Sequence, residues 1–102
     1  MSQSSEHRVS LPAEVTHAQA ASCLDAVRRA ILGAGTQPVV VDAAALTRFD
    51  SSCLAVLLAC RREALARGQS LWVQAMPLPL QELADLYGVE ALLAPAATHA
   101  AS

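Results

Sequence analysis

The sequence predicts a single α/β domain in which strands and helices alternate along the chain. Three segments rich in β-branched and apolar residues, 9–15, 38–42 and 70–75, have the character of strands. The segments that follow them place apolar residues at helical intervals, and each helical pattern stops at a glycine. Because parallel strands joined by helices cross over in one hand, the helices come to lie against the sheet. We expect a small mixed β-sheet with helices packed mainly on one face.

The first predicted strand lies in "RVSLPAEV", where apolar residues alternate with polar or turn-forming ones from Val9 to Val15. A period of two is typical of a strand with one buried face. Pro12 has no N–H to donate to a neighbouring strand. We therefore expect this strand to lie at an edge of the sheet or to contain a bulge.

The first predicted helix follows directly. Thr16 and Gln19 have the spacing of a capping box, which predicts a helix start. Apolar residues then recur at helical intervals: Ala20, Leu24, Val27 and Ile31. The "GAG" sequence at 33–35 predicts the end of this helix.

The central strand is "PVVVD", residues 38–42, which has no polar face. Such a strand is typical of a sheet position that is buried on both sides. The loop "AALTRFDSS" leads from it into a second helix, roughly residues 52–67, which ends at Arg67-Gly68.

The second helix is apolar on two stripes. One stripe, which we assign to the sheet, consists of Leu54, Leu57, Leu58 and Leu65. The other consists of Cys53, Val56, Cys60 and Ala64. A helix that is apolar nearly all round is usually covered on several sides. The second stripe is therefore either covered by the other helices or partly a docking face.

The end of the chain supplies a third strand, "SLWVQA", and a short helix, "LQELADLYG", for which Gly88 is the C-terminal stop. We expect residues 1–8 to be a flexible N-terminal arm, residues 9–93 to form the domain, and residues 94–102 to be a disordered tail.

Composition argues against several classes of function. The net charge of −2 provides no basic surface for nucleic acid. Three cysteines without CxxC spacing and three scattered histidines predict neither a metal site nor a cofactor. The polar start of the chain lacks the apolar segment of a signal peptide, and no apolar run is long enough to insert in a membrane. We expect a reduced, cytoplasmic protein.

The most distinctive segment is "RFDSS", residues 48–52, just before the second helix. Asp50 or Ser51 can serve as a helix cap, which typically contributes about 1 kcal/mol. The same position also presents a hydroxyl beside unpaired backbone N–H groups, which favour phosphate or the polar groups of a partner. Both interpretations remain open from the residues alone.

Catalysis has little support in the sequence. Cys53 lies in a first helical turn, where a thiol pKa can fall, but no histidine is near it in sequence to serve as a base. Ser51 lacks the G-x-S-x-G context of a nucleophilic serine, and glycine-rich phosphate loops are absent. We predict that the protein is not an enzyme.

Residues 39–58, "VVVDAAALTRFDSSCLAVLL", resemble the signature of STAS domains, the anti-sigma-factor-antagonist family. In that family a buried strand ending in Asp leads through an apolar loop to Asp-Ser-Ser/Thr and a helix. The resemblance covers about residues 9–93. It implies that Ser51 corresponds to the position that is phosphorylated in the sigma-regulating members. Asp50, Asp42 and Glu14 match acids of the family motifs.

The sequence also departs from the family pattern. Thr16 replaces the acid that closes the first-strand motif, and Cys53 stands where the family usually has glycine. These departures favour a different branch over a phosphorylation switch. "LADLYGVEALL" and the minimal, alanine-rich chain are similar to the small STAS subunit of the Mla phospholipid transporter, an MlaB-like protein.

The resemblance to this branch implies a non-enzymatic adaptor. Such a subunit binds the cytoplasmic ATPase of an Mla-type ABC transporter, at the inner face of the inner membrane, and supports its work in maintaining outer-membrane lipid asymmetry. We expect the partner-binding residues to be Ser51, Ser52, Asp50, Leu54, Val56, Arg48 and Tyr87. The alternative function is an anti-sigma-factor antagonist, switched by phosphorylation of Ser51, whose partner is an anti-sigma factor kinase.

Overall fold

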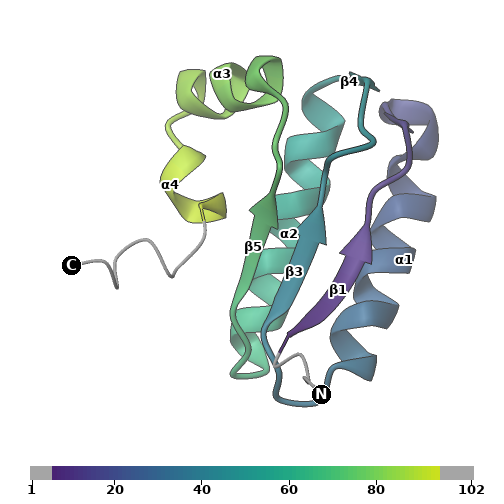
Figure 1. The fold of residues 1–102 in the computed structure, drawn as a ribbon, viewed down its shortest axis with the longest axis vertical. Helices are drawn as coiled ribbons and strands as arrows, with labels where there is room; N and C mark the ends of the chain where they lie inside the picture. Colours follow the sequence, from purple (N-terminus) through teal and green to yellow (C-terminus); the bar gives the residue numbers. More distant parts are fainter. Residues whose placement is uncertain (1–5, 95–102) are drawn as a thin grey trace.

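The computed structural model describes residues 6–94 and confirms the predicted alternation of strands and helices (Figure 1). In chain order the elements are β1 (His7–Ser10), β2 (Glu14–Val15), the 3-10 helix η1 (His17–Gln19), α1 (Ala20–Gly33), β3 (Val39–Asp42), β4 (Arg48–Phe49), α2 (Ser51–Ala66), β5 (Leu71–Gln74), α3 (Leu78–Leu86) and α4 (Glu90–Leu93).

The main sheet has three strands in the order β1-β3-β5, with β3 in the centre. His7 pairs with Val39, and Val39 pairs with Leu71. A separate two-stranded ladder joins β2 to β4. Every strand pair in residues 6–94 is parallel, so the expectation of a mixed sheet is wrong. The reason is that a helix returns the chain to the same end of the sheet between successive strands of each ladder.

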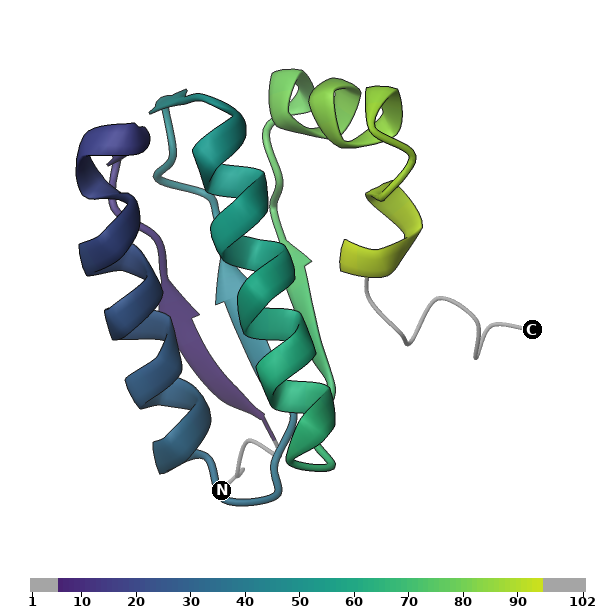
Figure 2. The same cartoon turned by 180° about the vertical axis from the view of Figure 1, so that it is seen from behind.

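The helices α1 and α2 cover one face of the sheet, as Figure 2 shows from behind. In both views α3 lies past the C-terminal end of β5 and α4 lies beside its outer edge, on the side away from α1 (Figures 1 and 2). The prediction that helices pack mainly on one face is confirmed.

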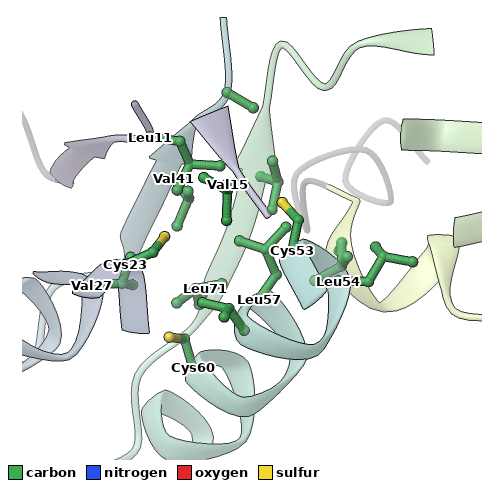
Figure 3. Packing of buried hydrophobic residues seen from close by; sticks show 14 of the residues in the cluster. Leu11, Val15, Cys23, Val27, Val41, Cys53, Leu54, Leu57, Cys60 and Leu71 are labelled. Carbon is green, nitrogen blue, oxygen red and sulfur yellow. The ribbon is translucent and has the colours of Figure 1, made fainter. Parts of the chain in front are cut away.

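The core lies between the sheet and these two helices. The side chains of Val39, Val40 and Val41 are fully buried, as predicted for a central strand with no polar face. Figure 3 shows Cys23 and Val27 of α1 and Leu57 and Cys60 of α2 among the core side chains. The core is aliphatic and built from small units, which the near absence of aromatic residues requires.

The two apolar stripes of α2 differ in how far they are buried. The stripe containing Cys53, Val56, Cys60 and Ala64 is buried, and α2 packs against α1, so this stripe is not a docking face. In the leucine stripe Leu57 is buried as predicted, but Leu65 is 48% exposed. The assignment of Leu65 to the sheet is wrong, because its side chain lies at the surface while the neighbouring Ala64 is the buried residue of the last turn.

Several boundaries differ from the sequence prediction. The first strand is divided at Pro12 into β1 and β2, because proline cannot continue the ladder, and β1 is an edge strand as predicted. The capping box of Thr16 and Gln19 is present, but it opens the short η1 ahead of α1. The helix α4 was not predicted.

The expected arm and tail fall largely outside the described residues, which exclude 1–5 and 95–102. His7 and Arg8, placed in the arm by the sequence prediction, already pair with Val39 and Val40 of β3. Gly68 and Gly88 have φ of 79° and 73°, the left-handed conformation that ends a helix, and they follow α2 and α3 as predicted.

Candidate functional site

The segment from Arg48 to Ser52 lies at the end of the sheet toward which the parallel strands run (Figure 1). Here β4 ends, Asp50 follows it, and α2 begins at Ser51. The short ladder between β4 and β2 places the start of η1 beside the start of α2. Two helical elements therefore begin next to each other on this end of the molecule.

Asp50 is the residue that holds these two beginnings together. Its Oδ1 accepts a hydrogen bond of 2.8 Å from the N–H of Ser52, which is the N-cap interaction of α2. Its Oδ2 accepts a hydrogen bond of 3.0 Å from the N–H of His17, the first residue of η1. One carboxylate thus satisfies an unpaired donor at the start of each element.

The same contacts make Asp50 a stronger acid. The hydrogen bond from the N–H of His17 lowers its pKa below the usual value, and the N–H of Ser52 adds to this effect. Both donors stabilise the charged carboxylate more than the neutral acid. Asp50 is exposed to solvent, and because its pKa is lowered it is charged at neutral pH while it bridges the two elements.

Ser51 is exposed on the first turn of α2, and no hydrogen bond joins its hydroxyl to another residue in the part of the chain that the structure describes. Ser52 is half-buried, and its N–H is taken by Asp50. The two serines therefore differ: Ser52 belongs to the cap, whereas the hydroxyl of Ser51 is available to another molecule.

The loop before the site is fixed to the segment between β1 and β2. The N–H groups of Thr47 and Arg48 both donate to the carbonyl oxygen of Ala13, at 2.8 and 3.0 Å. The Thr47 hydroxyl donates to the same oxygen at 3.2 Å. Arg48 also approaches Glu14, with 3.6 Å between Nε and Oε2, through side chains that are 76% and 45% exposed. Ser51 is thus presented from a well-tethered turn.

Two of the residues expected to contact a partner do not reach the surface. Leu54 and Val56 are only 2% and 6% exposed. Figure 3 shows Cys53 and Leu57 directed toward the sheet and Leu54 directed toward α4. Leu54 and Val56 support the first turn of α2 from within, which corrects their expected place in the contact. Phe49 is partly buried against the same core.

Tyr87 is 57% exposed, as an anchor for a partner would be. It follows the last residue of α3, and that helix extends away from β5 on the side opposite α1 (Figure 2). The structure thus places Tyr87 on a different element from the turn that carries Ser51.

The three thiols offer no nucleophile. Burial raises the pKa of Cys53 to about 12 and that of Cys60 to about 12, and burial also raises the pKa of Cys23. At neutral pH these side chains are protonated, and only a thiolate attacks or binds metal readily. Within residues 6–94 there is also no cluster of three or more His, Cys, Asp or Glu side chains that would hold a metal ion.

The role of His17 was missed by sequence reasoning. It contributes a backbone N–H, which any residue other than proline carries, and it lies 33 residues from Asp50 in the chain. The carbonyl of Ala13 was missed for the same reason. The capping-box spacing of Thr16 and Gln19 was the nearest available signal, because it indicated that an element begins at His17.

None of the helices in residues 6–94 combines the length and the apolar character needed to cross a bilayer.

Comparison with known proteins identifies the family of the chain. A family model described as "Mlab, STAS domain" matches residues 1–94. No match to a curated protein was found. The match to the family model covers most of the chain, including every strand and helix described above. The chain therefore belongs to the STAS domain family, in its MlaB-like group.

Proposed function

We propose that this protein is a non-enzymatic adaptor that binds the cytoplasmic ATPase subunit of an Mla-type phospholipid ABC transporter. It supports the assembly or activity of that transporter, and thereby the lipid asymmetry of the outer membrane. Ser51 makes the central polar contact, Asp50 and Ser52 hold its turn, and Arg48 lies at the rim.

Membership of the MlaB-like group supports this choice, since STAS domains act commonly through contacts with other proteins. The observation that carries the proposal is the difference between Ser51 and its neighbours. Asp50 and Ser52 are hydrogen-bonded to each other, and Asp50 is also hydrogen-bonded to η1, whereas the Ser51 hydroxyl makes no hydrogen bond among the described residues. A polar group on a rigid helix start is well suited to recognition, because little flexibility is lost on binding.

Co-purification of the chain with the transporter ATPase tests the proposal. Replacing Ser51→Glu places a charge without a counter-charge in the contact, and we expect the affinity to fall by about tenfold or more. Replacing Ser51→Ala removes a single neutral hydrogen bond, which is typically about 0.5–1.5 kcal/mol and corresponds to about two- to tenfold. Isothermal titration calorimetry on the purified proteins gives both numbers.

Ser70→Glu is the matched control. Ser70 is also an exposed serine, but it precedes β5 and so lies at the opposite end of the sheet. We expect this variant to bind as the wild type does. Equal binding by the wild type and by both Ser51 variants would show that this turn is not the contact.

A phosphorylation switch is the second candidate, and the exposure of the Ser51 hydroxyl is the observation that favours it. A phosphate there would adjoin the charged carboxylate of Asp50, which would oppose it and alter the surface. Mass spectrometry of protein isolated from its native cell distinguishes the two: phosphate on Ser51 supports the switch, and unmodified Ser51 together with ATPase binding supports the adaptor.

A further inference from the structure

The outer face of α3 carries leucines that the fold does not use. Leu78, Glu82, Asp85 and Leu86 recur at intervals of four, three and one residues, so they share one side of the helix. We call these four residues the α3 outer surface. Leu78 is 63% exposed and Leu86 is 76% exposed, whereas Leu80 and Ala84 on the inner side are fully buried.

Such exposure is concentrated in one part of the molecule. Among residues 6–94 six large apolar side chains are strongly exposed, and four of them lie between residues 78 and 92: Leu78, Leu86, Tyr87 and Leu92. Single exposed leucines are ordinary, but several within one short segment indicate a contact surface. Apolar side chains alone do not distinguish one partner from another. The charged residues around them therefore indicate which kind of partner binds.

Those charges are all of one sign. Glu82 and Asp85 lie between the two leucines, and Glu90 follows at the start of α4. All seven cationic side chains of the sequence are arginines, and the last of them is Arg67. Within residues 6–94 the ion pairs of the chain lie elsewhere, and neither Glu82 nor Asp85 takes part in one. The α3 outer surface is therefore apolar with uncompensated negative charge.

We propose that the α3 outer surface docks a helix of the partner protein that carries arginine or lysine between apolar residues. A helix of this kind buries Leu78 and Leu86 along its apolar stripe and places its cations against Glu82 and Asp85. Identifying the partner as the transporter ATPase rests on the proposed function above. The chemistry of the docked helix follows from α3 alone.

The negative charge argues against two other occupants. An anionic membrane surface attracts basic segments and repels acidic ones, so Glu82 and Asp85 oppose lipid binding. A second copy of the chain, placed symmetrically, would bring the same two acids against each other. A basic, apolar protein helix is the occupant that meets both the leucines and the acids.

Affinity for the purified ATPase is the quantity to measure, with the full chain and its variants. Leu78→Ser together with Leu86→Ser removes the apolar contact, and we expect binding to weaken about tenfold. Leu32→Ser is the control, because Leu32 is 56% exposed on the last turn of α1, at the other end of the molecule. This control is expected to bind as the wild type does. Circular dichroism confirms that each variant is folded.

Charge is tested separately with Glu82→Lys, for which Asp25→Lys on α1 is the control reversal; unlike Glu82, Asp25 forms an exposed ion pair of 2.9 Å, with Arg29. We expect Glu82→Lys to weaken binding about three- to tenfold and to reduce its dependence on salt. Asp25→Lys is expected to leave the affinity within about twofold of the wild type, since salt screens exposed charges that lie far from the contact.

The possible outcomes separate the two proposals. Weaker binding by both α3 variants, with unchanged controls, supports the docked helix. If Ser51→Glu prevents binding while the α3 variants bind as the wild type does, the docked helix is excluded and the adaptor function stands. If the wild type does not bind the ATPase, the adaptor function fails and this inference fails with it. If the α3 variants change only self-association in sedimentation experiments, the occupant is a second copy and the inference is overturned.

Discussion

Asp50 and Gln69 perform similar tasks at opposite ends of the sheet, by different physical means. Asp50, at the carboxyl ends of the strands, is exposed and accepts hydrogen bonds from two N–H groups that begin η1 and α2. Gln69 precedes β5 at the other end and is 2% exposed. Its Nε2 donates to the carbonyl oxygens of Ile31 and Gln37, at 3.1 and 3.3 Å, and so joins the end of α1 to the loop before β3.

The two residues differ in their access to water and in their charge. Water can replace part of the hydrogen bonding of Asp50, because its carboxylate and the N–H groups that donate to it are at the surface. Water cannot easily replace the Gln69 amide, because its hydrogen bond to the carbonyl of Ile31, which also accepts from the N–H of Ala34 at 3.3 Å, is buried. We infer that the end holding Gln69 secures the fold, whereas the end holding Asp50 can be altered by pH or by a partner without unfolding the domain.

The largest expected effect is therefore at Gln69. Replacing Gln69→Leu keeps the volume but removes both donated hydrogen bonds, together with Oε1, which is buried and has no partner among the described residues. Loss of the unpaired Oε1 offsets part of the loss of the two hydrogen bonds, and we expect the free energy of unfolding to fall by about 1 kcal/mol. Urea denaturation followed by circular dichroism measures it. The matched control is Gln81→Leu, since Gln81 is only partly buried and donates one hydrogen bond, to Met76. Equal losses for the two variants would contradict the special importance of Gln69.

A smaller effect, and one that depends on pH, is expected at Asp50. Because the native pKa is lowered, the stability that Asp50 contributes is present above the unfolded pKa of about 3.9 and is lost as the pH falls through the lower native value. Asp50→Ala should thus be less stable than the wild type at pH 7, with a difference that shrinks as the pH drops below about 4.

The comparison with Gln69 sharpens this prediction. The amide of Gln69 does not titrate, so the stability lost in Gln69→Leu should be nearly the same at pH 7 and at pH 4. Parallel urea titrations at a series of pH values test both variants together. A deficit of Asp50→Ala that stays constant down to pH 2 would show that its hydrogen bonds to His17 and Ser52 do not depend on charge.

The two residues also mark how far the sequence predicts this molecule. The central strand, the helix ends at Gly68 and Gly88 and the capping box of Thr16 all depend on neighbours in the chain, and all of them are present. Asp50 was recognised as a helix cap, because a cap too is local. Its second contact, with His17, was not, because it spans 33 residues and ends on a backbone N–H.

Burial was the other quantity that local patterns did not determine. Leu54 and Leu65 belong to one leucine stripe, yet Leu54 is 2% exposed and Leu65 is 48% exposed. The packing of α4 against α2 accounts for part of this difference, and α4 was not predicted from the sequence. The exposed leucines of α3 were missed similarly, because a helical pattern does not reveal which side another element covers.

The smallest expected effect lies at the rim of the site, between Arg48 and Glu14. The two side chains are largely exposed and 3.6 Å apart, and ion pairs of this kind contribute about 0–1 kcal/mol. Arg48→Ala should consequently change the free energy of unfolding by no more than about 0.5 kcal/mol in urea denaturation, with the difference vanishing at high salt. A larger loss would mean that the side chain of Arg48 stabilises the turn beyond this ion pair. The backbone hydrogen bonds to Ala13 are retained in Arg48→Ala, so they would not explain such a loss.

If the stability of Arg48→Ala is unchanged but its binding to the ATPase weakens, Arg48 contributes to the contact and not to the fold. This is the result that the comparison with Gln69 predicts, because residues at this end of the sheet can change without unfolding the domain.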